Sequence, residues 1–205
     1  KGLMEKHIVF GNALVDMYAK CGAVAKARRV LEDLPFRNIV SWNALIAGYA
    51  QQGQGHEALN CFTQMQAEHL SPNAVTFTCI LKACADTEAI NKGMEIHSEI
   101  IQSESLKCDI ILATALVEMY VKWGALAKAH DVFSKIPVRN RFAWNTLIAG
   151  YVEQGMPGKA LDYYEEMQVE GPAPDSFTFV WSLKACGNLG EVDKGQEIHA
   201  EVVRK

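Results

Sequence analysis

The feature that most limits how this chain can fold is an internal repeat. "SWNALIAGYAQQG" at residues 41–53 returns as "AWNTLIAGYVEQG" at residues 143–155. The same shift of 102 residues places "LVDMY" on "LVEMY" and "KGMEIH" on "KGQEIH". Repeat units that stack into arrays are usually about 20 to 50 residues long, which indicates that a finer period lies inside this one.

Three independent features divide the long period in the same way, at spacings of 31, 35, 36, 31 and 35 residues. The first is a small residue that opens an apolar stripe: Ala27, Ala58, Gly93, Ala129, Ala160 and Gly195. The second is an aromatic ring or a thiol: Tyr18, Tyr49, Cys84, Tyr120, Tyr151 and Cys186. The third is a larger apolar residue: Leu34, Met65, Ile100, Ile136, Met167 and Val202. This shared rhythm indicates an array of repeated units.

Each unit has the pattern of two short helices. "EALNCFTQM" places Ala58, Phe62 and Met65 on one helical face. The preceding "QQGQG" supplies a turn, because Gly53 and Gly55 tolerate the positive φ that helix ends require. A hairpin of this kind buries its stripe only by stacking on its neighbours. The sequence therefore predicts an all-α fold, an alpha-alpha superhelix (solenoid) of helix-turn-helix repeats.

Composition and charge exclude several classes of protein. The hydrophobic share of 49% and the charged share of 21% are ordinary for a folded domain. No apolar run approaches the length of about 18 residues that a membrane span needs, so we expect no membrane contact. The first residues carry no signal or transit pattern, and we expect any targeting segment to lie upstream. A net charge of −4 disfavours nucleic-acid binding unless positive charge gathers on one face.

The reactive residue types do not form a catalytic or metal-binding pattern. The six cysteines contain no CxxC pair, which disfavours zinc and predicts free thiols, with Cys84 and Cys186 filling the core. A zinc deaminase needs CxxC together with HxE, and the histidines of the repeated "EIH", His97 and His199, fall on helix-stripe positions. We therefore expect no catalytic residues, no metal and no cofactor, although a catalytic module could follow in a longer parent protein.

The repeat vocabulary resembles a known family. Trp42, Leu45, Ala58 and Phe62 partly fit the tetratricopeptide pattern, but that family keeps a regular period of about 34 residues. The alternation of 31, 35 and 36 residues instead resembles the pentatricopeptide repeat (PPR) family, in its PLS subclass of plant organellar RNA-editing factors. "NALVDMYAKCG" with "LPFRN" is similar to its short motif, "VSWNALIAGYAQQGQGHEALNCFTQMQ" to its standard motif, and "FTCILKACA" with "KGMEIHSEII" to its long motif.

The resemblance implies a register for the whole chain. Residues 1–7 are then the tail of a preceding long motif, followed by the motifs 8–38 (short), 39–73 (standard), 74–109 (long), 110–140 (short), 141–175 (standard) and 176–205 (truncated long).

The resemblance also implies single-stranded RNA binding, with about one base read by each motif. The family reads a base with the fifth residue, here Asn12, Asn43, Thr78, Thr114 and Asn145, while Val180 in the last motif cannot form hydrogen bonds. The second reading position is the last residue of each motif: Asn38, Asn73, Asp109, Asn140 and Asp175. The alternative for this last set is helix N-capping, for which Asn and Asp are preferred.

The donors and acceptors of these pairs permit a base order. Written 5′ to 3′, the implied order is pyrimidine (Asn12/Asn38), pyrimidine (Asn43/Asn73), G (Thr78/Asp109), A (Thr114/Asn140) and U (Asn145/Asp175).

Two further sets complete the implied RNA site. The second residue of each motif wedges between bases in the family, here Val9, Val40, Val75, Ile111, Phe142 and Phe177. The alternative for this set is ordinary packing at helix starts. Phosphates would contact Lys20, Lys82, Lys122 and Lys184. Gln51 and Glu153 stand where the short motifs carry lysine, so we expect a weakly basic groove.

The family role is guidance of RNA processing, most often C-to-U editing, in the mitochondrion or plastid. The implied partners are single-stranded RNA and small organellar editing cofactor proteins. The alternative function is a protein–protein interaction scaffold of the tetratricopeptide type, which binds a partner helix or an editing cofactor without reading RNA.

Overall fold

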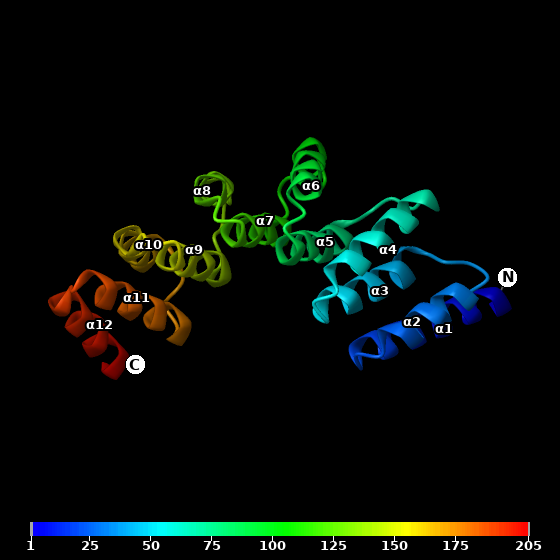
Figure 1. The fold of residues 1–205 in the computed structure, drawn as a ribbon, viewed down its shortest axis with the longest axis horizontal. Helices are drawn as coiled ribbons and strands as arrows, with labels where there is room; N and C mark the ends of the chain where they lie inside the picture. Colours follow the sequence, from blue (N-terminus) through cyan, green and yellow to red (C-terminus); the bar gives the residue numbers. More distant parts are fainter. Residues whose placement is uncertain (1, 205) are drawn as a thin grey trace. The chain divides into compact units, whose positions relative to one another are not determined.

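The computed structural model describes residues 2–204, and the side chains of residues 8–204. This part of the chain folds into helices joined by short turns, without strands (Figure 1), which confirms the predicted all-α class. The helices are α1 (Gly2–Lys20), α2 (Val24–Asp33), α3 (Ile39–Gln51), α4 (Gly55–Ala67), α5 (Ala74–Thr87), α6 (Ile90–Gln102), α7 (Ile110–Lys122), α8 (Leu126–Ser134), α9 (Arg141–Glu153), α10 (Pro157–Glu170), α11 (Ser176–Leu189) and α12 (Val192–Arg204). None of these helices is long and apolar enough to cross a bilayer.

The chain divides into two compact bodies, residues 1–112 and residues 113–205. In the first body, α1 packs on α2 and α3, α3 packs on α4 and α5, and α5 packs on α6. In the second body, α9 packs on α8, α10 and α11, and α11 packs on α10 and α12. Within each body, successive hairpins therefore pack on one another, which is the local stacking expected of a solenoid.

The turn between α3 and α4 uses its two glycines differently. Gly53 has φ +70°, in the left-handed region that glycine tolerates, as predicted. Gly55 does not, because it is the first residue of α4. A Cβ at Gly55 would lie 2.5 Å from Thr87 Cγ2 and 3.0 Å from the Ala83 carbonyl oxygen. The second glycine therefore serves close packing of α4 on α5, which corrects its predicted role in the turn.

Most of the predicted stripe positions lie in the core. Ala27, Ala58, Ala129 and Ala160 are completely buried, as are Met65 and Met167. Cys84 and Cys186 are buried among apolar side chains as free thiols, and burial raises the pKa of Cys84 to about 11. Val202 departs from the pattern, with 41% of its surface exposed.

The expected motif start at residue 8 is not a helix start. α1 runs without interruption from Gly2 to Lys20 and passes through this position. The later first helices all follow an Asn or Asp, whereas residues 1–7 contain no Asn, Asp, Ser or Thr to cap a helix at residue 8.

Candidate nucleic-acid interface

The last residues of the expected motifs all cap the first helix of the next hairpin. In each case the side-chain oxygen accepts a hydrogen bond from a backbone N–H in the first turn of that helix. Asn38, Asn73 and Asp175 form complete capping boxes with the residue three positions later. The capping interpretation is therefore correct for the whole set: Asn38, Asn73, Asp109, Asn140 and Asp175.

Four of these capping residues also hydrogen-bond the fifth residue of their own motif. In three pairs the amide Nδ2 of the fifth residue donates to the Oδ1 of the last residue, and in the Thr114 pair the direction is reversed. The distances are 3.3 Å for Asn12–Asn38, 3.1 Å for Asn43–Asn73, 3.1 Å for Asn145–Asp175 and 3.3 Å from Asn140 Nδ2 to Thr114 Oγ1. Capping and pairing therefore involve the same side chains, so the two interpretations of the last residue are compatible.

A buried threonine fixes the amide in both standard motifs. The Thr76 hydroxyl donates to Asn43 Oδ1 at 2.7 Å, and the Thr178 hydroxyl donates to Asn145 Oδ1 at 2.6 Å. Both threonines are completely buried. The oxygen and one N–H of each asparagine are thus engaged, and within residues 8–204 the second N–H of each amide forms no hydrogen bond. Sequence reasoning missed these threonines, although their place three residues after a cap is a capping-box signal.

The fifth residues are largely covered by neighbouring helices. Asn43 is 9% exposed, Thr114 is 6% exposed and Asn145 is 7% exposed. The last residues Asn73 and Asn140 are exposed. Each pair therefore presents a narrow polar edge to solvent, and its deeper atoms are held by hydrogen bonds.

The carboxylate of Asp175 has one engaged oxygen and one that is more open. Oδ1 accepts from the Thr178 backbone N–H at 3.0 Å, the Thr178 hydroxyl at 3.0 Å and Asn145 at 3.1 Å. Oδ2 lies 3.9 Å from Arg141 Nε. Burial acts to raise the pKa of Asp175, but the hydrogen bonds from Thr178 and Asn145 and the charge of Arg141 outweigh it and lower the pKa. Asp175 is therefore an ionised acceptor at neutral pH.

The first long motif does not form the expected pair. The Thr78 hydroxyl donates to the Ala74 carbonyl of its own helix at 2.8 Å. Asp109 caps α7 through the backbone N–H groups of Ile111 and Leu112. Within residues 8–204, no hydrogen bond joins Thr78 to Asp109, because the threonine hydroxyl is turned back onto its helix. The structure thus does not bring these two predicted residues together by a direct bond.

The first short motif also lacks the threonine that fixes the amide. Ser41 takes the corresponding capping-box position, and its hydroxyl donates to the Asn38 carbonyl at 2.8 Å. Asn12 Oδ1 is buried and has no hydrogen-bond partner. The Asn12 amide is consequently held by one bond fewer than Asn43 or Asn145.

The predicted wedge residues are exposed apolar side chains, which lie at the starts of the first helices except for Val9, which lies inside α1. Their exposed fractions are 69% for Val9, 57% for Val40, 56% for Val75, 66% for Ile111, 56% for Phe142 and 49% for Phe177. A side chain that packs under the next turn would be covered, so ordinary packing does not explain this set. Apolar groups that recur beside a polar pair form a surface suited to stacking against flat rings.

In the second body, the predicted groups meet in one pocket of about 420 Å³. Its lining comes from the first helices α7, α9 and α11 and from the cap of α11: Glu118, Val121, Lys122, Phe142, Asn145, Thr146, Ala149, Gly150, Glu153, Asp175, Phe177 and Trp181. The wedge pair Phe142 and Phe177 thus lines the same space as the polar pair Asn145 and Asp175. Trp181 was not predicted as a site residue.

The four predicted phosphate-binding lysines are exposed on first helices. Lys20 Nζ lies 2.7 Å from the Asp16 carboxylate, which partly neutralises it. Lys184 Nζ lies 4.4 Å from the centre of the Trp181 ring. Together with Glu118 and Glu153 in the pocket, these contacts give a surface with little excess positive charge, as the sequence predicts.

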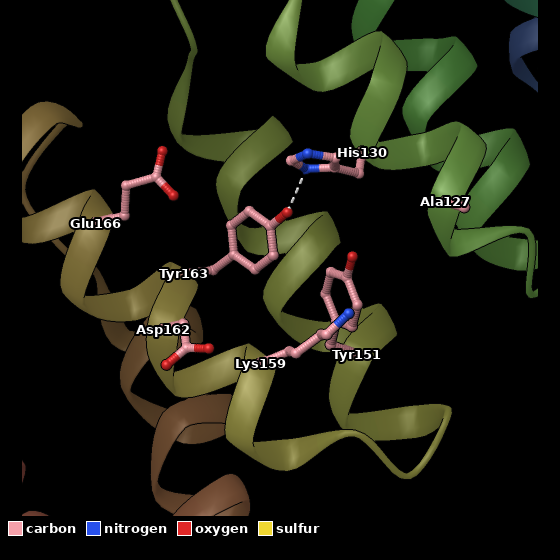
Figure 2. Close-up of a pocket in the computed structure, with 7 residues that line it drawn as sticks. All are labelled: Ala127, His130, Tyr151, Lys159, Asp162, Tyr163 and Glu166. Atoms are coloured by element: carbon pink, nitrogen blue, oxygen red, sulfur yellow. Dashed lines mark hydrogen bonds between the residues drawn. The ribbon is translucent and has the colours of Figure 1, made fainter.

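A second pocket in the same body contains titratable side chains next to a tyrosine–histidine pair. Figure 2 shows His130 facing the hydroxyl of Tyr163, with Tyr151, Lys159, Asp162 and Glu166 around them. Burial, followed by a hydrogen bond with Tyr151, raises the pKa of Tyr163, so this phenol stays protonated. The neutral phenol is a weaker nucleophile and a weaker base than a phenolate.

The histidines of the long motifs do not gather metal ligands. His97 with Glu99 and His199 with Glu201 have HxE spacing, but no CxxC accompanies them. Among the residues that the structure describes, no group of three His, Cys, Asp or Glu side chains could hold a metal ion.

Stacked two-helix hairpins, with paired polar side chains along their first helices, define this chain as an α-solenoid repeat protein. The sequence model of the PPR repeat matches residues 12–39, and that of the PPR repeat family matches residues 37–86 and 139–188. The chain belongs to the PPR repeat family.

Relatives from Arabidopsis thaliana match nearly the whole chain. Pentatricopeptide repeat-containing protein At4g33990 is 41% identical over 197 residues, which is 96% of this chain and 24% of the relative. The chloroplastic At4g18520 is 36% identical and is matched over 98% of this chain and 32% of its own length. The mitochondrial At3g53360 is 36% identical, over 96% and 26% respectively. The chain thus spans about a quarter to a third of the length of these relatives.

Solved structures share the fold. The pentatricopeptide repeat protein PPR10 in complex with an 18-nt psaJ RNA element matches with a TM-score of 0.79 and 20% identity, over 92% of this chain and 28% of that protein. The PPR domain of Arabidopsis thaliana protein-only RNase P 1, in complex with tRNA, matches with a TM-score of 0.67 and 12% identity, over 93% and 99%. At these identities the likeness establishes the fold alone.

Proposed function

We propose that this chain is a sequence-specific single-stranded RNA-binding array that contacts about one base with each motif. The observation that carries the proposal is the recurring site in which a hydrogen-bonded fifth–last pair stands beside exposed wedge side chains. In the second body, both elements line one pocket. That a structural neighbour was solved with a single RNA element supports this function.

The caps support the motif boundaries. We propose the motifs 8–38, 39–73, 74–109, 110–140, 141–175 and 176–205, with residues 1–7 belonging to a preceding long motif. The first helices α3, α5, α9 and α11 begin directly after Asn38, Asn73, Asn140 and Asp175, which supports cutting the chain after these residues. In this register, the last residue of each motif caps the first helix of the following motif.

The hydrogen-bonding atoms that remain available suggest the base at each standard motif. Asn145 keeps one N–H donor and Asp175 keeps Oδ2 as an acceptor, which complements a carbonyl and the N3–H of uracil. Asn43 and Asn73 each keep an N–H donor, which complements the carbonyl and ring-nitrogen acceptors of a pyrimidine.

The remaining pairs complete the proposed order. Asn12 and Asn38 read a pyrimidine, Thr78 and Asp109 read G through separate contacts, and Thr114 and Asn140 read A. Bound RNA runs 5′ to 3′ from the first motif to the last, in the order pyrimidine, pyrimidine, G, A, U.

The wedge residues and lysines supply the contacts that do not depend on sequence. The bases insert between Val9, Val40, Val75, Ile111, Phe142 and Phe177, and phosphates contact Lys20, Lys82, Lys122 and Lys184. Four phosphate contacts on a single strand would give a slope of about −3 in a plot of log affinity against log salt concentration. A much steeper slope would mean that other cations bind the backbone.

We further propose that the parent protein is of the PLS subclass and guides RNA processing, most often C-to-U editing, in the mitochondrion or plastid. Relatives that carry chloroplastic or mitochondrial names support this compartment. Small organellar editing cofactor proteins are the proposed protein partners. This chain itself supplies recognition rather than catalysis, so any deamination depends on another module.

The alternative is a tetratricopeptide-like scaffold that binds a partner helix without RNA. Binding of a partner helix does not require the observed arrangement of the Asn145 amide. Its oxygen accepts from Thr178, its nitrogen donates to Asp175, and it lines a pocket together with Phe142 and Phe177. The fifth–last pairs therefore favour RNA.

The test is selection of bound sequences from a randomised single-stranded RNA pool by the parent chain and by Asn145→Thr. The substitution creates a Thr/Asp pair, so the preference at that nucleotide should move from U to G. Asn60→Thr makes the same chemical change on an exposed position of α4 and should leave the selected sequence unchanged. An unchanged preference in Asn145→Thr, with RNA still bound, would contradict base reading by this pair.

A further inference from the structure

Trp181 is a partly exposed aromatic residue in α11 and is absent from the buried core. Its ring centre lies 6.0 Å from that of Phe177, and Lys184 Nζ lies 4.4 Å from the Trp181 ring centre. Residues three and four positions apart share one face of a helix, so Phe177, Trp181 and Lys184 form a single row along α11. This row begins in the pocket that Asn145 and Asp175 also line.

The corresponding row in the first long motif has a different chemistry. The 102-residue shift places Val75, Cys79 and Lys82 on these three positions. The fifth residue differs as well, since Thr78 corresponds to Val180, which is 61% exposed and cannot hydrogen-bond. The second long motif thus combines a fifth residue that cannot select a base with an indole at the edge of the pocket.

We infer, on the basis of the proposed function, that Trp181 binds the nucleotide at the second long motif by stacking on its base without selecting its identity. Every base has a π face, so stacking on an aromatic side chain tolerates any sequence. Lys184, held beside the indole, is placed to contact the phosphate of the same nucleotide.

Acidic and aromatic side chains both line the pocket in which the row begins. Glu118, Glu153 and Asp175 line the pocket together with Lys122, so the backbone of RNA gains little electrostatic attraction. Three aromatic side chains, Phe142, Phe177 and Trp181, line the same space. A flat ring gains more from this lining than a phosphate does.

The experiment measures binding of fluorescent RNA to the 205-residue chain by anisotropy. The RNA carries the proposed order followed by one variable nucleotide, which is A, C, G, U or an abasic site. The protein is the parent, Trp181→Cys, which introduces the residue of the first long motif, or Trp181→Phe. We expect the four bases to bind the parent with affinities within about threefold, and the abasic RNA to bind about tenfold more weakly.

The expected result for Trp181→Cys is a loss of about tenfold on normal RNA and no further loss on abasic RNA, with Trp181→Phe in between. Parent-like affinity of Trp181→Cys would overturn the inference, and so would an equal loss on normal and abasic RNA, which indicates a structural role only. If Asn145→Thr shows no change in base preference while the abasic effect depends on Trp181, the base-reading function fails and the stacking site stands. Absence of RNA binding by the parent overturns both.

Discussion

The two copies of the 102-residue repeat share the buried residues of their standard first helices and differ at several surface positions of the predicted RNA site. Trp42, Leu45 and Ile46 correspond to Trp144, Leu147 and Ile148, and all six are buried. The exposed wedge and edge positions differ instead: Val40 becomes Phe142, Val75 becomes Phe177, Asn73 becomes Asp175 and Cys79 becomes Trp181. A single scaffold therefore carries two different surfaces, although some buried positions differ as well, such as Cys61 and Tyr163 or Ile80 and Ser182.

A second difference lies behind the groove, where identical residues make different bonds. Trp42 Nε1 donates to Glu68 at 2.8 Å, and Arg37 Nε lies 2.9 Å from the same carboxylate. In the second copy, Trp144 Nε1 and Arg139 Nε are buried without partners, and Glu170 lies 3.5 Å from Arg139 Nη1. Helix α4 ends at Ala67, which frees Glu68 to turn inward, whereas α10 continues through Glu170.

The largest expected effect comes from the glycine at which first helices touch. A Cβ at Gly48 would lie 2.7 Å from Ala19 Cβ and 3.2 Å from its Cα, while a Cβ at Gly150 would meet Val121 Cγ1 at 2.4 Å. The contact at Gly48 includes the Ala19 Cα, which is backbone, whereas the contact at Gly150 is with Val121 side-chain atoms, which move only if this β-branched residue leaves its preferred helical rotamer. Gly48→Ala should lower the free energy of unfolding by about 2 kcal/mol, and Gly150→Ala by about 1 kcal/mol. Urea denaturation of each variant measures this, and equal losses would contradict the proposed difference.

The next effect concerns the wedges. Changing Phe142 and Phe177 together to valine gives the second copy the wedge of the first, and RNA affinity should fall about tenfold because stacking area is lost. The reciprocal variant, Val40→Phe with Val75→Phe, should bind more tightly. Anisotropy with one RNA of the proposed order measures both. If the reciprocal variant also binds more weakly, aromatic size is not what distinguishes the two copies.

The indole partners should give a smaller effect. Glu68→Gln weakens a charge-assisted bond to Trp42 and Arg37 and should cost about 1 kcal/mol of stability. Glu170→Gln, with its exposed and longer contact, should cost less than about 0.5 kcal/mol. Thermal denaturation at matched pH compares the stabilities of the two variants. A larger loss for Glu170→Gln would contradict the proposal that the earlier end of α4 strengthens the contacts of Glu68.

The smallest expected effect is a pH dependence confined to the second copy. The pKa of Asp175 is lowered in the folded protein, so its ionised form stabilises the fold above the unfolded pKa of about 4, and this contribution is lost as pH falls through the folded value. Asp175→Asn, which recreates the cap of the first copy, should melt below the parent at pH 7. The two melting temperatures should approach each other as the pH falls below the unfolded pKa of about 4 and should converge only below the lower folded value.

The reciprocal change serves as the matched control. Asn73→Asp places a carboxylate at the first cap and should introduce the same pH dependence there. A gap between Asp175→Asn and the parent that stays constant from pH 7 to pH 3 would exclude ionisation as its cause.

The fold was predictable because spacing and apolar stripes are properties of the chain, and the rhythm through Ala58, Gly93 and Ala129 already divides it into hairpins. The meeting of Asn145 with Asp175 was likewise implied by the register. The engagement of Thr178, the missing bond at Thr78 and the free Trp144 indole were not predictable. The two threonine contacts depend on the rotamer that each hydroxyl adopts, and the unpaired Trp144 Nε1 depends on where α10 ends. Contacts between residues far apart in the sequence determine both.

The hydrogen bond that joins a fifth residue to the cap of the next helix has a consequence for transplanting motifs. The specificity of one motif and the anchoring of its successor share three side chains, such as Asn145, Asp175 and Thr178. A graft that is cut directly after Asp175 would separate these partners and leave a buried amide oxygen unmatched. Exchangeable segments in this protein therefore extend three residues into the following motif, so that donor and acceptor travel together.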